Sequence, residues 1–148
     1  MNEEQELLAG VAITSFRLNG QFLALAEDLA RPVGLTAARW QVLGAVLNEP
    51  LAVAGIARAM GITRQSVQRI ADLLVDDGLA EYRDNPAHRR AKLLTPTAAG
   101  RAAVDRITPA HRRAAKALAA ELGPTRLAAA LSAMQALSDA VDSLSDRR

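Results

Sequence analysis

A cluster of basic side chains lies in the middle of the chain, around a predicted turn. Arg83, Arg89, Arg90 and Lys92 fall within ten residues, and Asn85-Pro86 marks the turn between them. A solvated loop does not need this much positive charge, so the pattern favours contact with an anionic partner. Guanidinium groups suit phosphate oxygens, and an arginine also gains energy in a narrow, strongly negative minor groove of DNA.

A second set of polar side chains precedes this loop. Arg64, Gln65, Gln68 and Arg69 fall on the outward side of a predicted helix. Arginine offers paired donors to guanine, and glutamine pairs with adenine. Taken alone, such residues more often form a solvated helix face.

The residues around this set predict a helix-turn-helix. Gly61 follows Ala57 by four residues, and Val67 follows Gly61 by six. A small residue lets the two helices approach, the glycine provides the left-handed conformation that ends the first helix, and the branched residue fills the angle between them. Thr63 can cap the second helix. Its apolar residues recur at helical spacing, and they are Val67, Ile70, Ala71, Leu74 and Val75.

Two short strands, Leu79–Arg83 and Ala91–Thr95, are predicted on either side of the basic loop. A basic hairpin directly after a recognition helix is typical of a wing, with His88-Arg89-Arg90 at its tip. The alternative is a charged hairpin that is exposed only for solubility.

Long helices are predicted at both ends of the chain. The first ends near Ala30, because Arg31-Pro32 stops it. A second helix is expected behind Thr36, through Trp40, Leu43 and Leu47. Thr95-Pro96 is expected to cap a later helix, in which Pro109 should produce a kink. A final helix follows Gly123-Pro124. The apolar stripes of the terminal helices exceed what one small chain can bury, so we expect a homodimer rather than a monomeric bundle.

The distribution of charge and the composition exclude several classes of protein. Residues 51–116 carry twelve basic and six acidic side chains, a net charge of +6, whereas the flanking segments are slightly acidic. No apolar run approaches a membrane span and no export signal is seen, so a cytoplasmic protein without membrane contact is expected. The chain has no cysteine, only two histidines and no phosphate-binding glycine motif, so neither an enzyme, a metal site nor a cofactor is expected.

Three segments in this order resemble the MarR (multiple-antibiotic-resistance regulator) family of winged helix-turn-helix transcription regulators. They are LTAARWQVL (35–43), ITRQSVQRIADLLVDDGLAEY (62–82) and RRAKLLTPTAAGR (89–101). The resemblance implies a mainly α fold with a small β-hairpin wing. It also implies a single domain, in which residues 1–34 and 97–148 form dimerisation helices and residues 35–96 form the DNA-binding lobe.

The resemblance further implies a homodimer on near-palindromic double-stranded operator DNA, acting as a repressor that a small phenolic or anionic effector releases. The expected DNA contacts are Thr63, Arg64, Gln65, Ser66, Gln68, Arg69, Arg89 and Arg90. Among these, Arg64, Gln65 and Gln68 would read bases, Ser66 and Arg69 would hold phosphate, and the two wing arginines would reach the minor groove. The alternative is a protein-interaction module that uses the winged fold without DNA.

The effector site is expected between the dimerisation helices and the winged lobe. Phe16, Trp40 and Leu43 would lie near it, and Arg17 or Arg39 could meet a carboxylate. Ordinary core positions for the apolar residues and surface positions for the arginines are the simpler interpretation.

Two positions depart from the family pattern. His88 stands where family wings often carry an acidic residue that orients an arginine, here matched to Arg90. The stretch Leu51-Ala52-Val53 lacks a side chain able to cap the first helix of the motif, a local cost of about 1 kcal/mol.

Overall fold

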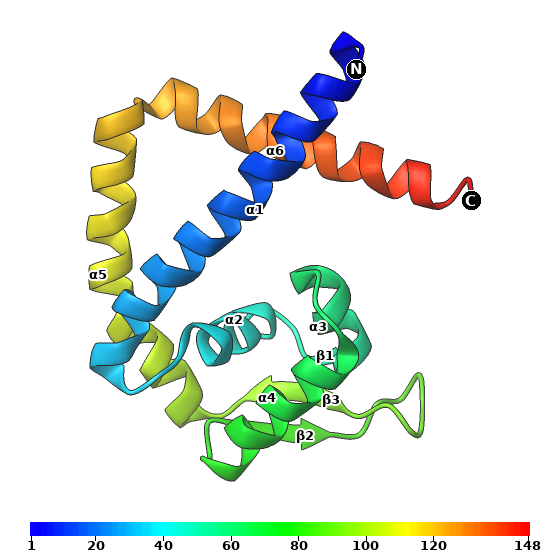
Figure 1. Cartoon of the computed structure of the whole chain (residues 1–148). Coiled ribbons are helices and arrows are strands. Elements are labelled where there is room, and N and C mark those ends of the chain that lie inside the picture. The colour runs from blue at the N-terminus through cyan, green and yellow to red at the C-terminus, as the bar shows by residue number, and fades with distance from the viewer. The chain divides into compact units, whose positions relative to one another are not determined.

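The computed structural model describes residues 1–148 (Figure 1). Its helices are α1 (Glu3–Ala30), a short 3-10 helix (Arg31–Val33), α2 (Ala37–Ala45), α3 (Val53–Met60), α4 (Arg64–Asp76), α5 (Ala98–Leu122) and α6 (Pro124–Ser145). Its strands are β1 (Leu51–Ala52), β2 (Ala80–Arg83) and β3 (Leu93–Pro96). The chain forms two compact units, Met1–Thr108 and Pro109–Arg148. None of the helices combines the length and apolarity that a membrane span requires.

Helix α2 begins beside two side-chain oxygens that cap it. Thr36 accepts a hydrogen bond from the Arg39 amide (3.1 Å), which caps α2 as predicted. Glu27 of α1 adds a carboxylate that accepts from the Ala37 amide (2.9 Å), at the end of the helix where a negative charge is favourable. In contrast, Ala52 precedes α3 without a side-chain cap, as the sequence indicated.

The first unit also contains a three-stranded antiparallel sheet with the strand order β1-β3-β2. The predicted hairpin is confirmed, with Tyr82 of β2 opposite Leu94 of β3. Two residues of β1 pair with the other edge of β3, Leu51 with Leu94 and Ala52 with Leu93. This third strand was not predicted, because two residues are too few to produce a strand pattern.

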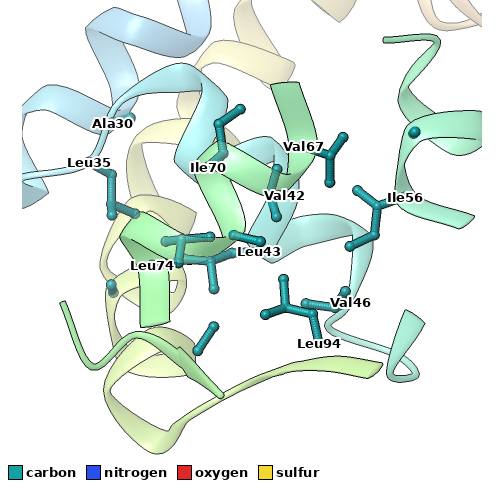
Figure 2. Packing of buried hydrophobic residues seen from close by; sticks show 14 of the residues in the cluster. Ala30, Leu35, Val42, Leu43, Val46, Ile56, Val67, Ile70, Leu74 and Leu94 are labelled. Atoms are coloured by element: carbon teal, nitrogen blue, oxygen red, sulfur yellow. The ribbon is translucent and has the colours of Figure 1, made fainter. Parts of the chain in front are cut away.

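One core holds the winged part of the chain together (Figure 2). Helices α2, α3 and α4, the residue after α2 and strand β3 each contribute side chains that are fully buried, and these are Val42, Leu43, Val46, Ile56, Val67, Leu74 and Leu94. The end of α1 and the start of α5 complete the cluster with Ala30, Ala103 and Ile107. Each such aliphatic side chain contributes roughly 1.5–3 kcal/mol through removal from water.

Two boundaries predicted from the sequence differ in the structure. Helix α2 ends at Ala45, so Leu47 lies beyond it. Thr95 and Pro96 belong to β3, and the residue that caps α5 is Thr97, whose hydroxyl accepts from the Gly100 amide (3.1 Å) and donates to the Gly78 carbonyl (2.6 Å). Pro109 lies inside α5, which continues on both sides of it.

The second unit contains the rest of α5 and α6. Gly123 adopts a positive φ (91°) between the two helices, and Pro124 starts α6, as predicted. No residue of α6 is buried, although its apolar residues recur at helical spacing. This helix therefore exposes an apolar stripe to solvent in the isolated chain.

Candidate nucleic-acid interface

The turn between α3 and α4 has the geometry that the sequence predicted. Gly61 ends α3 in the left-handed conformation (φ 67°), which is accessible to glycine at no steric cost. Thr63 caps α4, since its hydroxyl accepts from the Ser66 amide (3.1 Å) and donates to the Ser66 hydroxyl (2.9 Å). Val67 is fully buried in the angle between the helices. The first two turns of α4 are thereby fixed against the core.

The polar residues of α4 face outward. Arg64, Gln65, Gln68 and Arg69 are exposed, whereas Ser66 is half-buried beside the cap. Because Thr63 uses its proton on Ser66, the hydroxyl proton of Ser66 remains available for an external acceptor.

An open groove runs between the start of α4 and the wing. Its volume is about 710 Å³, and α4 contributes Arg64, Gln65 and Gln68 to its wall. The wing contributes Tyr82, Arg90, Ala91 and Lys92, and the segment at the start of α3 contributes Ala52, Val53 and Ala54. Arg89 is exposed but is not part of this wall. Of the groove's basic residues, Lys92 was counted in the basic cluster but was not selected as a contact from the sequence.

The loop between β2 and β3 projects beyond the strands (Figure 1) and is organised by its own side chains. Asn85 accepts from the Ala87 amide (3.0 Å), which forms the predicted turn. His88 then accepts from two backbone amides through Nδ1, from Arg90 at 3.3 Å and from Ala91 at 3.1 Å. An imidazole thus does here what a carboxylate could do, because an unprotonated ring nitrogen is also an acceptor. The sequence marked His88 as unusual but did not reveal this contact.

Replacing His88 with alanine is expected to loosen the loop. Loss of the Nδ1 acceptor leaves the Arg90 and Ala91 amides without their partner, at a cost of about 1 kcal/mol. Amide hydrogen exchange at these two residues should accelerate by roughly 5-fold. His88→Asn, which keeps a neutral side-chain acceptor, is the matched control and should preserve most of the protection. Equal exchange in the wild type and His88→Ala would contradict the role of the imidazole.

Gln68 takes part in a closed set of hydrogen bonds with Asp72 and Tyr82. Its Nε2 donates to Asp72 Oδ1 and to the Tyr82 hydroxyl, both at 2.9 Å. The Tyr82 hydroxyl donates to the same Asp72 oxygen at 2.5 Å. Burial raises the pKa of Tyr82 above its usual range, and the hydrogen bond to Asp72 and its charge raise it further. The phenol therefore keeps its proton, and the wing strand is linked to the recognition helix.

The five residues selected as effector contacts differ in their exposure. Leu43 is 0% exposed within the core, whereas Phe16 of α1 is 74% exposed and its neighbour Arg17 is also exposed. Arg39 is bound to Asp77 at the end of α4 (2.7 Å), so its charge already has an internal partner. Trp40 is half-buried and packs against the core. Leu43 is therefore an ordinary core residue, whereas Phe16 is not buried within the single chain.

The helix-turn-helix lies within a segment that matches a known family. The sequence model of the MarR family matches residues 33–91 of the chain. The protein Rv2011c of Mycobacterium tuberculosis is 44% identical over 101 residues, which cover 68% of this chain and 71% of that protein.

Solved structures share the fold. The MarR family transcription regulator SP03579 superposes with a TM-score of 0.77 at 21% identity, covering 98% of this chain and 97% of that one. BpsR of Bordetella bronchiseptica, a protein whose DNA binding is regulated by 6-hydroxynicotinic acid, gives a TM-score of 0.75 at 24% identity, covering 87% of this chain and 98% of that one. The predicted mainly α fold with a small wing is thus confirmed.

The family match includes the whole helix-turn-helix and the first strand and loop of the wing. The chain belongs to the MarR family of winged-helix transcription regulators, which are not enzymes.

Proposed function

We propose that this DNA-binding regulator is a homodimeric repressor that uses the groove between α4 and the wing to recognise a near-palindromic operator. The observation that carries the proposal is the convergence of Arg64, Gln65 and Gln68 from α4 with Arg90 and Lys92 from the wing on one open groove. Recognition helices read base edges through residues in their first turns, while basic loops hold the phosphate backbone.

The position of each polar side chain on α4 and the wing suggests which part of the DNA it contacts. Arg64, Gln65 and Gln68 read bases in the major groove, because they are exposed on the first two turns of α4. Arg69 and the Ser66 hydroxyl contact phosphate, and Thr63 supports them by holding the start of the helix. The wing arginines, Arg89 and Arg90, engage the minor groove or its rim, where the negative potential is enhanced.

The homodimer is supported by where the chain exposes apolar surface. All but two of the large exposed hydrophobic residues lie in the segments 1–34 and 97–148, and the two exceptions are Ile62 and Leu73. Exposed apolar stripes of this extent are typical of association surfaces rather than of monomers. We assign these terminal segments to dimerisation and residues 35–96 to DNA binding. A dimer would set two copies of α4 into major grooves about 10 bp apart.

Release by a small phenolic or anionic effector is the second part of the proposal. The fold neighbour BpsR supports it, since 6-hydroxynicotinic acid regulates the DNA binding of that protein. Phe16, Arg17, Arg39 and Trp40 are the proposed contacts, because their side chains are at least partly accessible. Leu43 is withdrawn from direct contact, because its side chain is enclosed by the core.

Selection of randomised duplexes by the purified protein tests the function directly. An enriched inverted repeat with half-sites one helical turn apart, bound with an affinity that falls steeply with salt, is the expected result. Titration of the winning duplex with aromatic carboxylates then tests release. Absence of enrichment together with flat salt dependence would contradict the proposal and would favour an interaction module.

Replacing Arg90 with alanine is expected to weaken binding to every duplex to a similar degree. Loss of one cationic contact should lower affinity by about 10-fold at moderate salt and reduce the slope of log affinity against log salt by about 1. The matched control is Arg83→Ala, which removes the same charge from an exposed residue of the same hairpin that pairs with Glu81 (3.2 Å). Similar losses in both variants would mean that only the overall charge of the hairpin matters.

A further inference from the structure

The hydrogen bonds around Gln68 determine which atom of its side chain is available to DNA. Nε2 carries two protons, and these have two acceptors within the chain, Asp72 Oδ1 and the Tyr82 hydroxyl. The only proton of the Tyr82 hydroxyl goes to Asp72. The amide oxygen, Oε1, is the atom that remains for an external partner.

The orientation of this amide follows from chemistry and does not rest on distances alone. A carboxylate only accepts hydrogen bonds, so Asp72 must face the amino group of Gln68 and not its oxygen. A flipped amide would set two acceptors against each other and would leave two donors without partners. Because Asp72 lies four residues after Gln68, the two side chains lie on the same face of α4. Tyr82 closes the arrangement from β2 and lines the groove together with Gln68.

An unrestrained glutamine would read DNA differently. It would bind adenine with two hydrogen bonds, accepting from N6 and donating to N7. With its amino group held by Asp72 and Tyr82, Gln68 presents its amide oxygen, an acceptor, as the atom without a hydrogen bond within the chain. Such an acceptor matches the exocyclic amino group of adenine or of cytosine. It opposes the carbonyl oxygens of guanine and thymine, which are acceptors as well.

We propose that Asp72 and Tyr82 are positioning residues that hold Gln68 as a hydrogen-bond acceptor, so that each half-site requires a base with an amino group, adenine or cytosine, opposite Gln68. The inference rests on the proposed function, because it concerns the bases that this DNA-binding surface selects. The same contacts also tie the wing strand to the recognition helix, so a test must separate base selection from simple support.

Base analogues in the selected duplex provide that separation without altering the protein. The contacted base is identified as the position whose preference disappears in Gln68→Ala. At this position, purine in place of adenine removes the amino group and should lower wild-type affinity by about 10-fold, within the range for a specific base contact. In contrast, 7-deazaadenine lacks only N7 and should change the affinity by less than about 2-fold, because Gln68 donates no hydrogen bond to N7.

Substitutions that free the amide should reverse this pattern. In Asp72→Ala and in Tyr82→Phe, the Gln68 amino group regains a free proton and can reach N7 of adenine. The base preferred opposite Gln68 should then change from adenine or cytosine to adenine alone, and 7-deazaadenine at this position should weaken binding. Asp76→Ala is the control, because it removes the same charge from the same helix and from a side chain that has no hydrogen bond to Gln68. Asp76→Ala should keep the wild-type base preference even if its overall affinity rises.

The outcomes distinguish this inference from the function on which it rests. Absence of any enriched sequence for the wild-type protein overturns both. An enriched operator overturns the inference alone if Gln68→Ala retains every base preference. The inference alone is also overturned if wild-type binding depends on N7 of adenine. It is likewise overturned if Asp72→Ala and Tyr82→Phe leave the base preference unchanged. Tyr82→Phe and the base analogues keep the test valid should Asp72→Ala prove unstable.

Discussion

Gly100→Ala is expected to abolish or severely weaken folding of the first unit. A Cβ at this position would lie 1.9 Å from the Leu79 carbonyl oxygen and 3.3 Å from Leu43 Cδ2. The carbonyl cannot easily withdraw, because it accepts a hydrogen bond from the Thr97 amide (3.1 Å) where β2 and α5 meet. Overpacking a rigid site costs about 1–3 kcal/mol of folding free energy and occasionally more. Because this contact is with the backbone, we expect Gly100→Ala to cost at least about 3 kcal/mol.

Urea denaturation of the two variants Gly100→Ala and Gly44→Ala measures this difference. Gly44 lies in α2, and a Cβ there would meet nothing within 4 Å. Alanine has the higher helix propensity, so Gly44→Ala should raise the free energy of unfolding, by up to about 1 kcal/mol. Stabilities that fall equally in both variants would show that the close approach of α5 to Leu79 is not what constrains residue 100.

The double substitution Met134→Glu/Val141→Glu is expected to convert the proposed dimer into monomers. Both side chains are 49% exposed on α6, and both belong to its apolar stripe. Burying two carboxylates in an association surface carries a large desolvation penalty, which the surface cannot offset. Because a dimer binds two half-sites together, loss of the second subunit should lower affinity for a two-half-site duplex by about 100-fold or more.

Sedimentation analysis and duplex binding at matched protein concentrations measure these effects. Gln135→Glu is the control, because it changes charge on the same helix one residue away, outside the apolar stripe. It should remain dimeric and bind as the wild type does. A wild-type protein that sediments as a monomer, or a double variant that remains a dimer, would disprove the assignment of α6 to the interface.

Local patterns in the sequence predicted the parts of the fold whose determinants are close together along the chain. The spacing of Ala57, Gly61 and Val67 was sufficient for the helix-turn-helix, because the turn is built from contacts within ten residues. The hairpin followed from two short apolar runs on either side of a turn. In contrast, β1 pairs with a strand about 40 residues later, and no local pattern in Leu51-Ala52 indicates that partner.

The polar contacts within the interface were less predictable than the exposed residues. Outward positions on α4 follow from the helical period, but the link between Gln68 and Tyr82 joins residues fourteen apart through the tertiary fold. Likewise, both Thr95 and Thr97 could have capped α5, and only the pairing of Thr95 within β3 decides between them. Phe16 is 74% exposed although its side chain is large and apolar, so residue type alone did not indicate whether it is buried.

The composition of the core also bears on the order in which the protein can form during synthesis. Ile107, one of the fully enclosed side chains, comes from the second half of the chain, and β3 must pair with strands on both of its sides. A nascent chain that has emerged only as far as the recognition helix therefore lacks the central strand and part of the apolar cluster. Because domains fold as cooperative units when their sequence becomes available, the DNA-reading surface should become rigid only after the start of α5 has left the ribosome. A regulator arrested or truncated before that point would carry every base-reading residue and still have no fixed surface on which to present them.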